Sequence, residues 1–123
     1  SSGKECLQIN VKDNSAFGSF VQIPAVDGTI EKIEVTIREP YKGRAIGIFP
    51  VGYTYTKDTL DKMKEQLAKD AIAISNETPS DVNNNEPFTF VIDNLSAKNL
   101  TQFSIFPTLG AVSITAITVT YSK

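Results

Sequence analysis

Apolar and polar residues alternate along most of this chain, with the two-residue period of a strand that buries one face. The alternation is clearest over residues 30–37, where polar residues separate Ile33, Val35 and Ile37. Segments of this kind, rich in β-branched and aromatic residues and bounded by turn formers, are residues 5–11, 17–23, 30–37, 44–51, 88–92, 101–106 and 111–121. The pattern therefore predicts an all-β fold, built as an antiparallel β-sandwich.

One segment has the periodicity of a helix. Between residues 59 and 70, Leu60, Met63 and Leu67 recur at spacings of three and four, and Asp58 is placed to cap the first turn. Lysines and carboxylates are mixed on the remaining positions, which is typical of a solvated face; a partner-binding face is the alternative. We expect one short helix, inserted into the sandwich near residues 59–70.

Residues 71–75 are open to two interpretations. They either continue the helix or form a strand, and the alternation of Ile72 and Ile74 with alanines favours the strand. Residues 77–87 have the composition of an exposed loop. The total is about eight strands with no regular strand-helix alternation, which argues against a parallel sheet.

The 123 residues are expected to form a single domain, residues 1–123, because no linker or internal repeat divides the chain. Its core should lie between two stacked sheets. The residues expected to be enclosed there are Leu7, Ile33, Val35, Phe90, Ile105 and Val119.

Composition and charge narrow the functional classes. The hydrophobic fraction of 41% and charged fraction of 21% are those of a globular protein rather than a disordered one. The net charge is −2, and the twelve Lys and Arg are interleaved with fourteen acidic residues, so no nucleic-acid partner is expected. No apolar run reaches the roughly 18 to 20 residues of a membrane span, and no signal segment precedes Ser1. The chain is expected to be either cytosolic or a mature secreted piece.

Catalytic and metal-binding residue types are scarce. The sequence has no His, which removes the usual general base and the commonest zinc ligand. Cys6 is the only cysteine and is expected to be a buried or edge-strand thiol; lipidation would require an apolar signal segment. Carboxylates such as Glu31, Glu34 and Asp61 fall on polar faces rather than in apolar surroundings. We expect no enzymatic activity, no cofactor and no zinc site.

Calcium is the one metal for which donors are grouped. The loop 81–86 offers two carboxylates, Asp81 and Glu86, and three Asn amides. The same residues also suit turns, because Asn and Asp tolerate left-handed backbone and bond to nearby amides. The turn interpretation is favoured.

Three tyrosines form the candidate binding site. Tyr53 and Tyr55 lie two residues apart, so an extended backbone puts both rings on one face, and Tyr41 is placed to approach them from the preceding turn. Sugars pack their C–H faces on such rings. The alternative is that these rings cover the edge of the core with their hydroxyls in water.

Three Asn-x-Ser/Thr triplets begin at Asn76, Asn94 and Asn99, all at expected loops or strand starts. Each is a potential acceptor for glycosylation in a host that modifies secreted proteins.

Two stretches carry a resemblance. Residues 18–37, an aromatic-aliphatic strand ending in Pro24 followed by a turn and an Ile-x-x-Ile-x-Val-Thr strand, resemble paired strands of β-sandwich modules in secreted and surface lipoproteins of gut bacteria. Residues 87–92 and 110–121 are similar to the last strands of those modules. The resemblance implies a galactose-binding-like or jelly-roll domain, one module of a longer exported protein, and it transfers no ligand-binding residue.

The expectation for function is a non-catalytic extracellular binding module, with carbohydrate as ligand and Tyr41, Tyr53 and Tyr55 as its contact surface. The alternative is a structural or adhesion domain of a cell-surface protein with no small-molecule ligand. The expected partners are a glycan and neighbouring domains of the same protein.

Overall fold

The fold was analysed in a computed structural model, which describes residues 4–11, 20–55 and 59–123. Along the chain the elements are β1 (Lys4–Asn10), β2 (Val21–Gln22), β3 (Thr29–Arg38), β4 (Ile46–Phe49), α1 (Leu60–Asp70), β5 (Ala73–Ile74), β6 (Phe88–Ile92), a 3-10 turn η1 (Ser96–Lys98), β7 (Ser104–Pro107) and β8 (Ser113–Ser122). Two four-stranded antiparallel sheets result, which confirms the all-β sandwich with one inserted helix.

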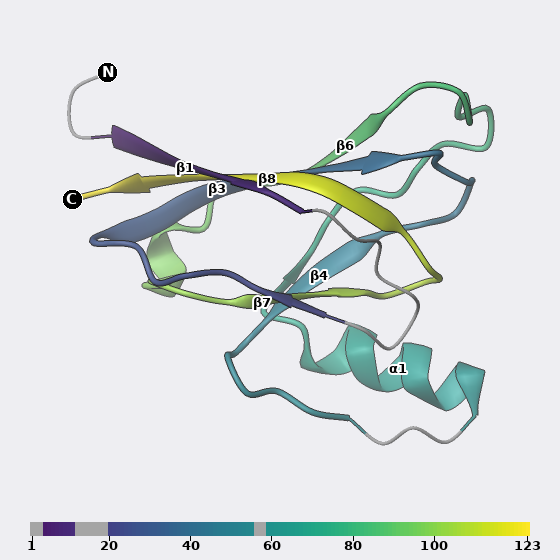
Figure 1. The fold of residues 1–123 in the computed structure, drawn as a ribbon. Helices are drawn as coiled ribbons and strands as arrows, with labels where there is room; N and C mark the ends of the chain where they lie inside the picture. The colour runs from purple at the N-terminus through teal and green to yellow at the C-terminus, as the bar shows by residue number, and fades with distance from the viewer. Residues whose placement is uncertain (1–3, 12–19, 56–58) are drawn as a thin grey trace.

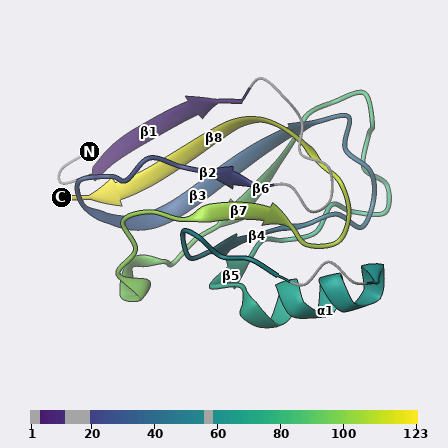
Figure 2. The same ribbon diagram turned by 60° about the horizontal axis from the view of Figure 1, so that its bottom comes forward.

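The sheets lie one over the other, and a helix lies under the lower one (Figure 1). Strand order is β1-β8-β3-β6 in one sheet, called here the long sheet, and β2-β7-β4-β5 in the other, called the short sheet. Figure 2 shows α1 running beneath the short sheet, on the side away from the long sheet. The molecule therefore has three layers: long sheet, short sheet and helix.

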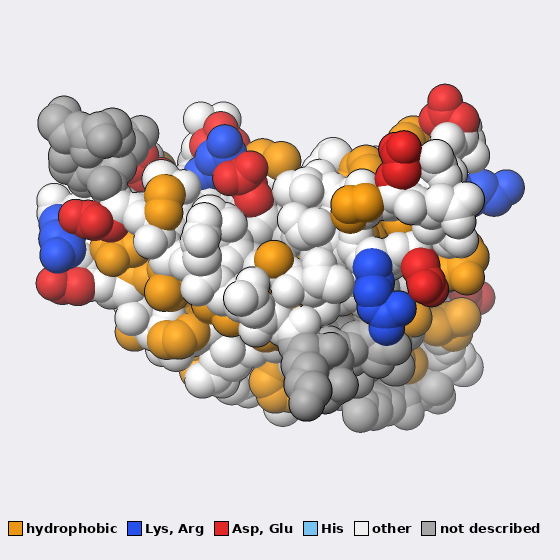
Figure 3. Space-filling model, turned by 45° about the horizontal axis from the view of Figure 1, so that its top comes forward, with side chains coloured by type: hydrophobic (Ala, Val, Ile, Leu, Met, Phe, Trp, Pro, Cys, Tyr) orange, Lys and Arg blue, Asp and Glu red, His pale blue; other side chains and the backbone are white. Residues whose placement is uncertain are grey.

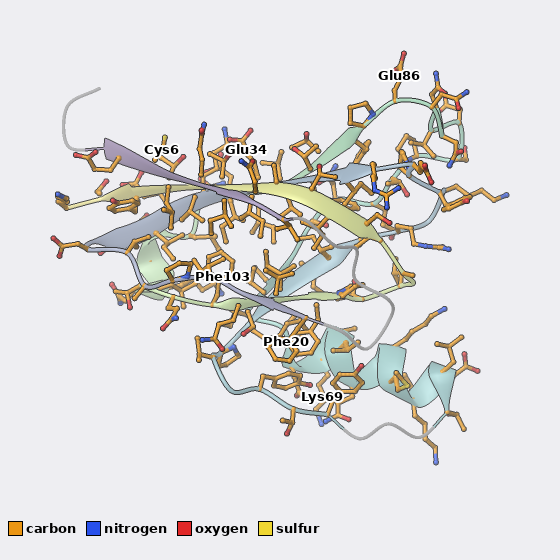
Figure 4. The ribbon with its side chains drawn as sticks, in the orientation of Figure 1. Cys6, Phe20, Glu34, Lys69, Glu86 and Phe103 are labelled. Atoms are coloured by element: carbon orange, nitrogen blue, oxygen red, sulfur yellow. The ribbon has the colours of Figure 1, made fainter. Side chains whose placement is uncertain are left out.

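The inter-sheet core is made by the inward-facing residues that the alternation predicts. Ile33, Val35, Phe90, Ile105 and Val119 are all fully buried there. Leu7 is only partly buried and packs against the same cluster from the edge strand β1. Phe103 lies between the two sheets, whereas Cys6 and Glu34 point away from the core on the outer face of the long sheet (Figure 4).

Two irregularities interrupt the β3–β8 ladder. At the first, Glu31 is an extra residue in β3 that falls between two residues paired with β8. At the second, Thr115 is an extra residue in β8 that falls between two residues paired with β3. Each is a bulge of one residue, which strengthens the local twist of the pair. Because of the first bulge, both Ile30 and Ile33 face the core although they are three positions apart.

The second core, defined here as the buried residues Phe49, Leu67 and Phe106, lies between the short sheet and α1. Tyr53, Tyr55 and Ala71 are partly buried against it. Gly47 permits this close packing, because a Cβ there would stand 3.0 Å from Thr108 Cγ2 and 3.4 Å from the Ala71 Cβ.

The helix is confirmed at residues 60–70, but its capping residue differs from the expectation. Thr59 is the N-cap, and its hydroxyl accepts a hydrogen bond from the Lys62 amide at 3.2 Å. Asp58, the residue expected to cap the helix, lies outside the described residues. Leu67 is the one residue of α1 that is fully buried.

Several strands are shorter than the alternation predicts, namely β2, β4, β5 and β7. Within the described part of the 17–23 segment, residues 20–23, the regular strand is β2, and Phe17 lies outside the described residues. The regular ladder stops because Pro24 has no amide hydrogen, although Ile23 and Val26 still donate to the Phe103 and Thr101 carbonyls at 3.1 and 2.8 Å. The 71–75 segment is confirmed as a strand, β5, with Ile72 turned toward the inter-sheet core and Ile74 exposed.

Candidate functional site

Tyr53 and Tyr55 lie together over the second core. A turn after β4, closed by the Tyr53 amide donating to the Pro50 carbonyl at 3.0 Å and by Gly52 at φ 87°, folds the chain back across the short sheet. The two rings stack with centroids 6.4 Å apart and an interplanar angle of 17°. The two-residue spacing therefore placed both rings on one face, as expected from the sequence.

The same two rings are engaged in packing. Tyr53 contacts the Phe49 ring at 4.7 Å, and both tyrosines meet the Phe106 ring edge-on, at 5.6 and 5.8 Å between centroids. Such edge-to-face contacts add to the burial of aromatic surface. Much of the ring surface that a sugar would need is thus already occupied by the protein.

The Tyr53 hydroxyl is tied to the end of the helix. It donates a hydrogen bond to Asp70 Oδ2 at 2.8 Å. Burial, together with this hydrogen bond and the negative charge of Asp70, raises the pKa of Tyr53 to about 12 from the usual 10.0. Burial also raises the pKa of Tyr55, and its buried hydroxyl oxygen has no hydrogen-bond partner among the residues that the structure describes.

An open depression lies along α1 next to these tyrosines. It has a volume of about 330 Å³, and the described residues that line it are Lys62, Glu65, Gln66, Lys69 and Asp70. Carboxylate, amide and ammonium groups are therefore grouped on one helix face, where successive turns bring them together. Asp70 joins the depression to Tyr53.

Tyr41 does not join the other two tyrosines. It precedes β4 while Tyr53 follows it, so the two lie at opposite ends of that strand. Tyr41 is 59% exposed, and the Arg44 guanidinium lies 5.9 Å from its ring centroid. Its backbone is held by Thr78, whose hydroxyl donates to the Tyr41 carbonyl at 2.6 Å. Among the described residues no ring contact joins Tyr41 to Tyr53 or Tyr55, so the expected grouping holds for those two rings alone.

The 81–86 loop uses its amides for its own turns. The Asn83 side-chain oxygen accepts from the Asn85 amide at 2.9 Å, and Asn84 Nδ2 donates to the Pro40 carbonyl at 3.1 Å. Within residues 4–11, 20–55 and 59–123, no group of three or more acidic, Cys or His residues is placed to hold a metal ion. These bonds agree with the turn interpretation of the loop.

Cys6 is an exposed thiol on the edge strand β1. Its sulfur lies 3.8 Å from the Thr120 hydroxyl on the outer face of the long sheet. The edge-strand interpretation is thus confirmed and the buried one is wrong, because even-numbered positions of β1 point away from the core.

The outer face of the long sheet is a broad polar surface that the sequence reasoning did not single out. Residues from all four strands contribute to it, among them Gln8, Thr36, Thr89, Thr118 and Thr120. The Thr36 and Thr89 hydroxyls lie 3.0 Å apart across neighbouring strands. Figure 3 looks toward this face and shows mostly uncharged polar side chains and backbone, with scattered hydrophobic and charged groups. The sequence signal for this surface is the set of polar residues that alternate with the core residues in each strand.

The three Asn-x-Ser/Thr triplets differ in their surroundings. The Asn76 side-chain oxygen accepts from the Val91 amide at 3.0 Å, and Thr78 of the same triplet is buried. Asn94 and Asn99 are exposed and have left-handed backbone, with φ of 59° and 56°. The first triplet therefore serves the fold, while the other two lie on the surface.

No helix in the described part of the chain combines the length and apolar character that crossing a membrane requires. No protein-family model matches the chain, and no curated protein matches it. Among solved structures, it is similar to a chain described as "Bacillus endospore appendages form a novel family of disulfide-linked pili". The identity is 13%, the similarity covers 97% of this chain and 84% of that chain, and the TM-score is 0.36. A similarity of that degree carries no argument about the function of this chain.

Proposed function

We propose that this chain is a non-catalytic structural or adhesion domain of a secreted or cell-surface protein. The observation that carries the proposal is the packing of Tyr53 and Tyr55 on Phe49 and Phe106. These rings were the strongest candidates for a sugar platform, and their surface is used to attach the helix to the short sheet. Because these rings serve the fold, a domain that presents a rigid surface is favoured, and a domain that binds a ligand on these rings is less well supported.

The rest of the surface fits the same role. Hydroxyl and amide side chains on four hydrogen-bonded strands make up much of the outer face of the long sheet, together with charged residues such as Lys32 and Glu34. Two packed layers of side chains hold that sheet from below, so its shape changes little on contact. The resemblance to sandwich modules of exported bacterial proteins supports the extracellular location.

Labelling of intact cells of the source organism tests the proposal. Antibodies raised against the domain should label unpermeabilised cells or detect the protein in the medium, and brief protease treatment of intact cells should remove the signal. Signal that appears only after permeabilisation would contradict the surface location. A soluble cytosolic marker serves as the control for cell integrity.

A second candidate, a carbohydrate-binding module, is favoured by one specific observation. The depression along α1 groups Gln66, Asp70 and Lys69 beside Tyr53, and such amide and charged groups bond sugar hydroxyls. Glycan contact by the similar gut-bacterial modules points the same way. Under this function the contact surface is the depression and the outer edges of Tyr53 and Tyr55, without Tyr41.

Native gels containing polysaccharides distinguish the two functions. A glycan-binding module should migrate more slowly in at least one such gel, and Gln66→Ala combined with Lys69→Ala should restore normal migration. Tyr41→Ala is the matched control, since this exposed residue lies away from the depression. Unretarded migration of the unaltered protein across a broad panel of polysaccharides would exclude the second candidate and leave the first.

A further inference from the structure

The four edge strands of the two sheets differ in length and in how far their outward backbone groups are already bonded. β2 and β5, the edges of the short sheet, have two residues each. On β6, an edge of the long sheet, the Asn76 side chain already accepts from the outward Val91 amide. β1, the other edge, is seven residues long and pairs with β8 in one unbroken register. Among the described residues, no strand pairs with its opposite side.

Most of β1 lacks the features that usually protect an edge strand, because its charged residues, Lys4 and Glu5, are confined to its first two positions. Natural edges carry Pro, bulges or charges that prevent pairing with another strand. Residues 6–11 of β1 and its continuation, Cys-Leu-Gln-Ile-Asn-Val, contain none of these. The side chains of Leu7, Ile9 and Val11 remain partly exposed at this border of the inter-sheet core.

The hydrogen-bond pattern identifies which backbone groups are directed outward. The Val11 amide donates to the Thr115 carbonyl at 2.8 Å, in register with the β1–β8 ladder. Bonded pairs alternate in an antiparallel ladder, so odd-numbered residues of β1 bond to β8. The amide and carbonyl groups of Cys6, Gln8 and Asn10 therefore point to the open side.

We propose that β1 pairs antiparallel with β1 of a second copy of this chain, about a two-fold axis at Gln8. This register uses all three outward residues: Gln8 faces its own counterpart, and Cys6 faces Asn10 of the other copy. Leu7 then lies opposite Ile9 of the other copy on the core side. The two long sheets become one continuous sheet of eight strands.

The polarity of residues 6–10 favours a second copy as the occupant. A strand added here must be apolar beside Leu7 and Ile9, polar on the solvent side and uncharged in the middle, and β1 itself has this pattern. The two copies of Glu5 stand at opposite ends of the pair, about 20 Å apart at the usual rise per residue. That separation exceeds the Debye length of about 8 Å at physiological ionic strength, so their repulsion is screened. The inference concerns assembly and does not depend on where the protein resides.

Sedimentation and light scattering of the full chain test the pairing. The mass should rise with concentration from 13.4 kDa toward twice that value. Two matched double variants test the register, because both change only exposed side chains. Cys6→Lys with Asn10→Lys places like charges opposite each other and should reduce association at least tenfold. Cys6→Lys with Asn10→Glu places opposite charges there and should retain association.

Cross-linking provides an independent measurement of the same register. In a Cys6→Ser background, Gln8→Cys puts the two thiols at a bonded pair with Cα atoms about 5.5 Å apart, within disulfide range. Oxidation should convert this variant to a covalent dimer, while native Cys6 should cross-link far less. A monomer at every concentration would overturn the proposal. Equal association of the two charged variants would overturn it as well, since the dimer would then use another surface.

Discussion

The two cores of this protein differ in how they are enclosed. The inter-sheet core is bounded on both sides by hydrogen-bonded sheets and consists mostly of Ile and Val, with Phe90 and Phe103. The second core has a sheet on one side only, and its other side is closed by α1 and the segment that carries Tyr53 and Tyr55. It is small and aromatic, and a single residue of α1, Leu67, is fully buried in it.

This difference indicates two levels of stability in one domain. Opening the inter-sheet core separates the sheets, whereas opening the second core detaches only a helix and a loop. Regions with few buried contacts open at lower free energy than the global unfolding transition. The helix layer should therefore be the first part to open, and variants in the two cores should have different signatures.

The largest effect is expected from Phe90→Ala. Phe90 is fully buried between the sheets, so the substitution leaves a cavity and should lower the free energy of unfolding by about 3–5 kcal/mol. Urea denaturation followed by far-UV circular dichroism measures it. Val91→Ala, at a neighbouring position that is 39% exposed, should change stability by less than about 0.5 kcal/mol. Equal losses for the two variants would contradict the described core.

Leu67→Ala should have a smaller and more local effect. It removes the main helix contact of the second core and should cost about 2 kcal/mol, near the low end for buried Leu, because a one-sided core can partly collapse. Hydrogen exchange should speed up in α1 while β3 and β8 stay protected. Leu60→Ala, at a helix position that is 54% exposed, is the control. Uniform loss of protection in both sheets would show that the two cores open together.

Thr59→Ala removes the N-cap of α1. Loss of the hydrogen bond from the Lys62 amide should cost about 1 kcal/mol and should raise hydrogen exchange at the start of the helix. Thr59→Ser keeps a hydroxyl that can cap and should behave like the unaltered protein. If both variants lose the same stability, capping is not the cause.

The smallest effect is expected from Tyr53→Phe, which should cost about 1 kcal/mol or less below pH 10, since it removes the hydrogen bond to Asp70. The folded-state pKa of Tyr53, about 12, lies above its ordinary value of 10.0. The stabilisation from the protonated hydroxyl is therefore complete below pH 10 and is lost as the pH rises toward 12. Urea midpoints across that range should fall less steeply for the variant. Parallel pH profiles would contradict this coupling.

The alternation of residues was sufficient for the strands of the long sheet, because each strand there has one buried and one solvated face. β3, β6 and β8 lie where Ile33, Phe90 and Val119 predicted them. The same rule did not reveal the second core, because the strands beside that core are buried on both faces and need not alternate. In β4 and β7 all four residues of each strand are buried.

The candidate site was only partly predictable for a related reason. The proximity of Tyr53 and Tyr55 follows from local geometry, since residues two apart in extended backbone share a face. The separation of Tyr41 from them depends on β4 and on the Thr78 bonds to the Tyr41 turn, which join segments distant in sequence. The bond from Tyr53 to Asp70 likewise depends on how α1 packs, and neither residue type indicates it alone.

The central position of β8 has a consequence for how the chain is made. β8 lies between β1 and β3, and its register joins Ser122 to both Lys4 and Thr29. On the ribosome, β1 and β3 are synthesised long before their common neighbour, so neither has this partner until residues 113–122 emerge. The long sheet must close after synthesis of those residues, and closing such a long loop slows the reaction. Until then the nascent chain exposes unpaired strand edges, which are sites for pairing with other chains.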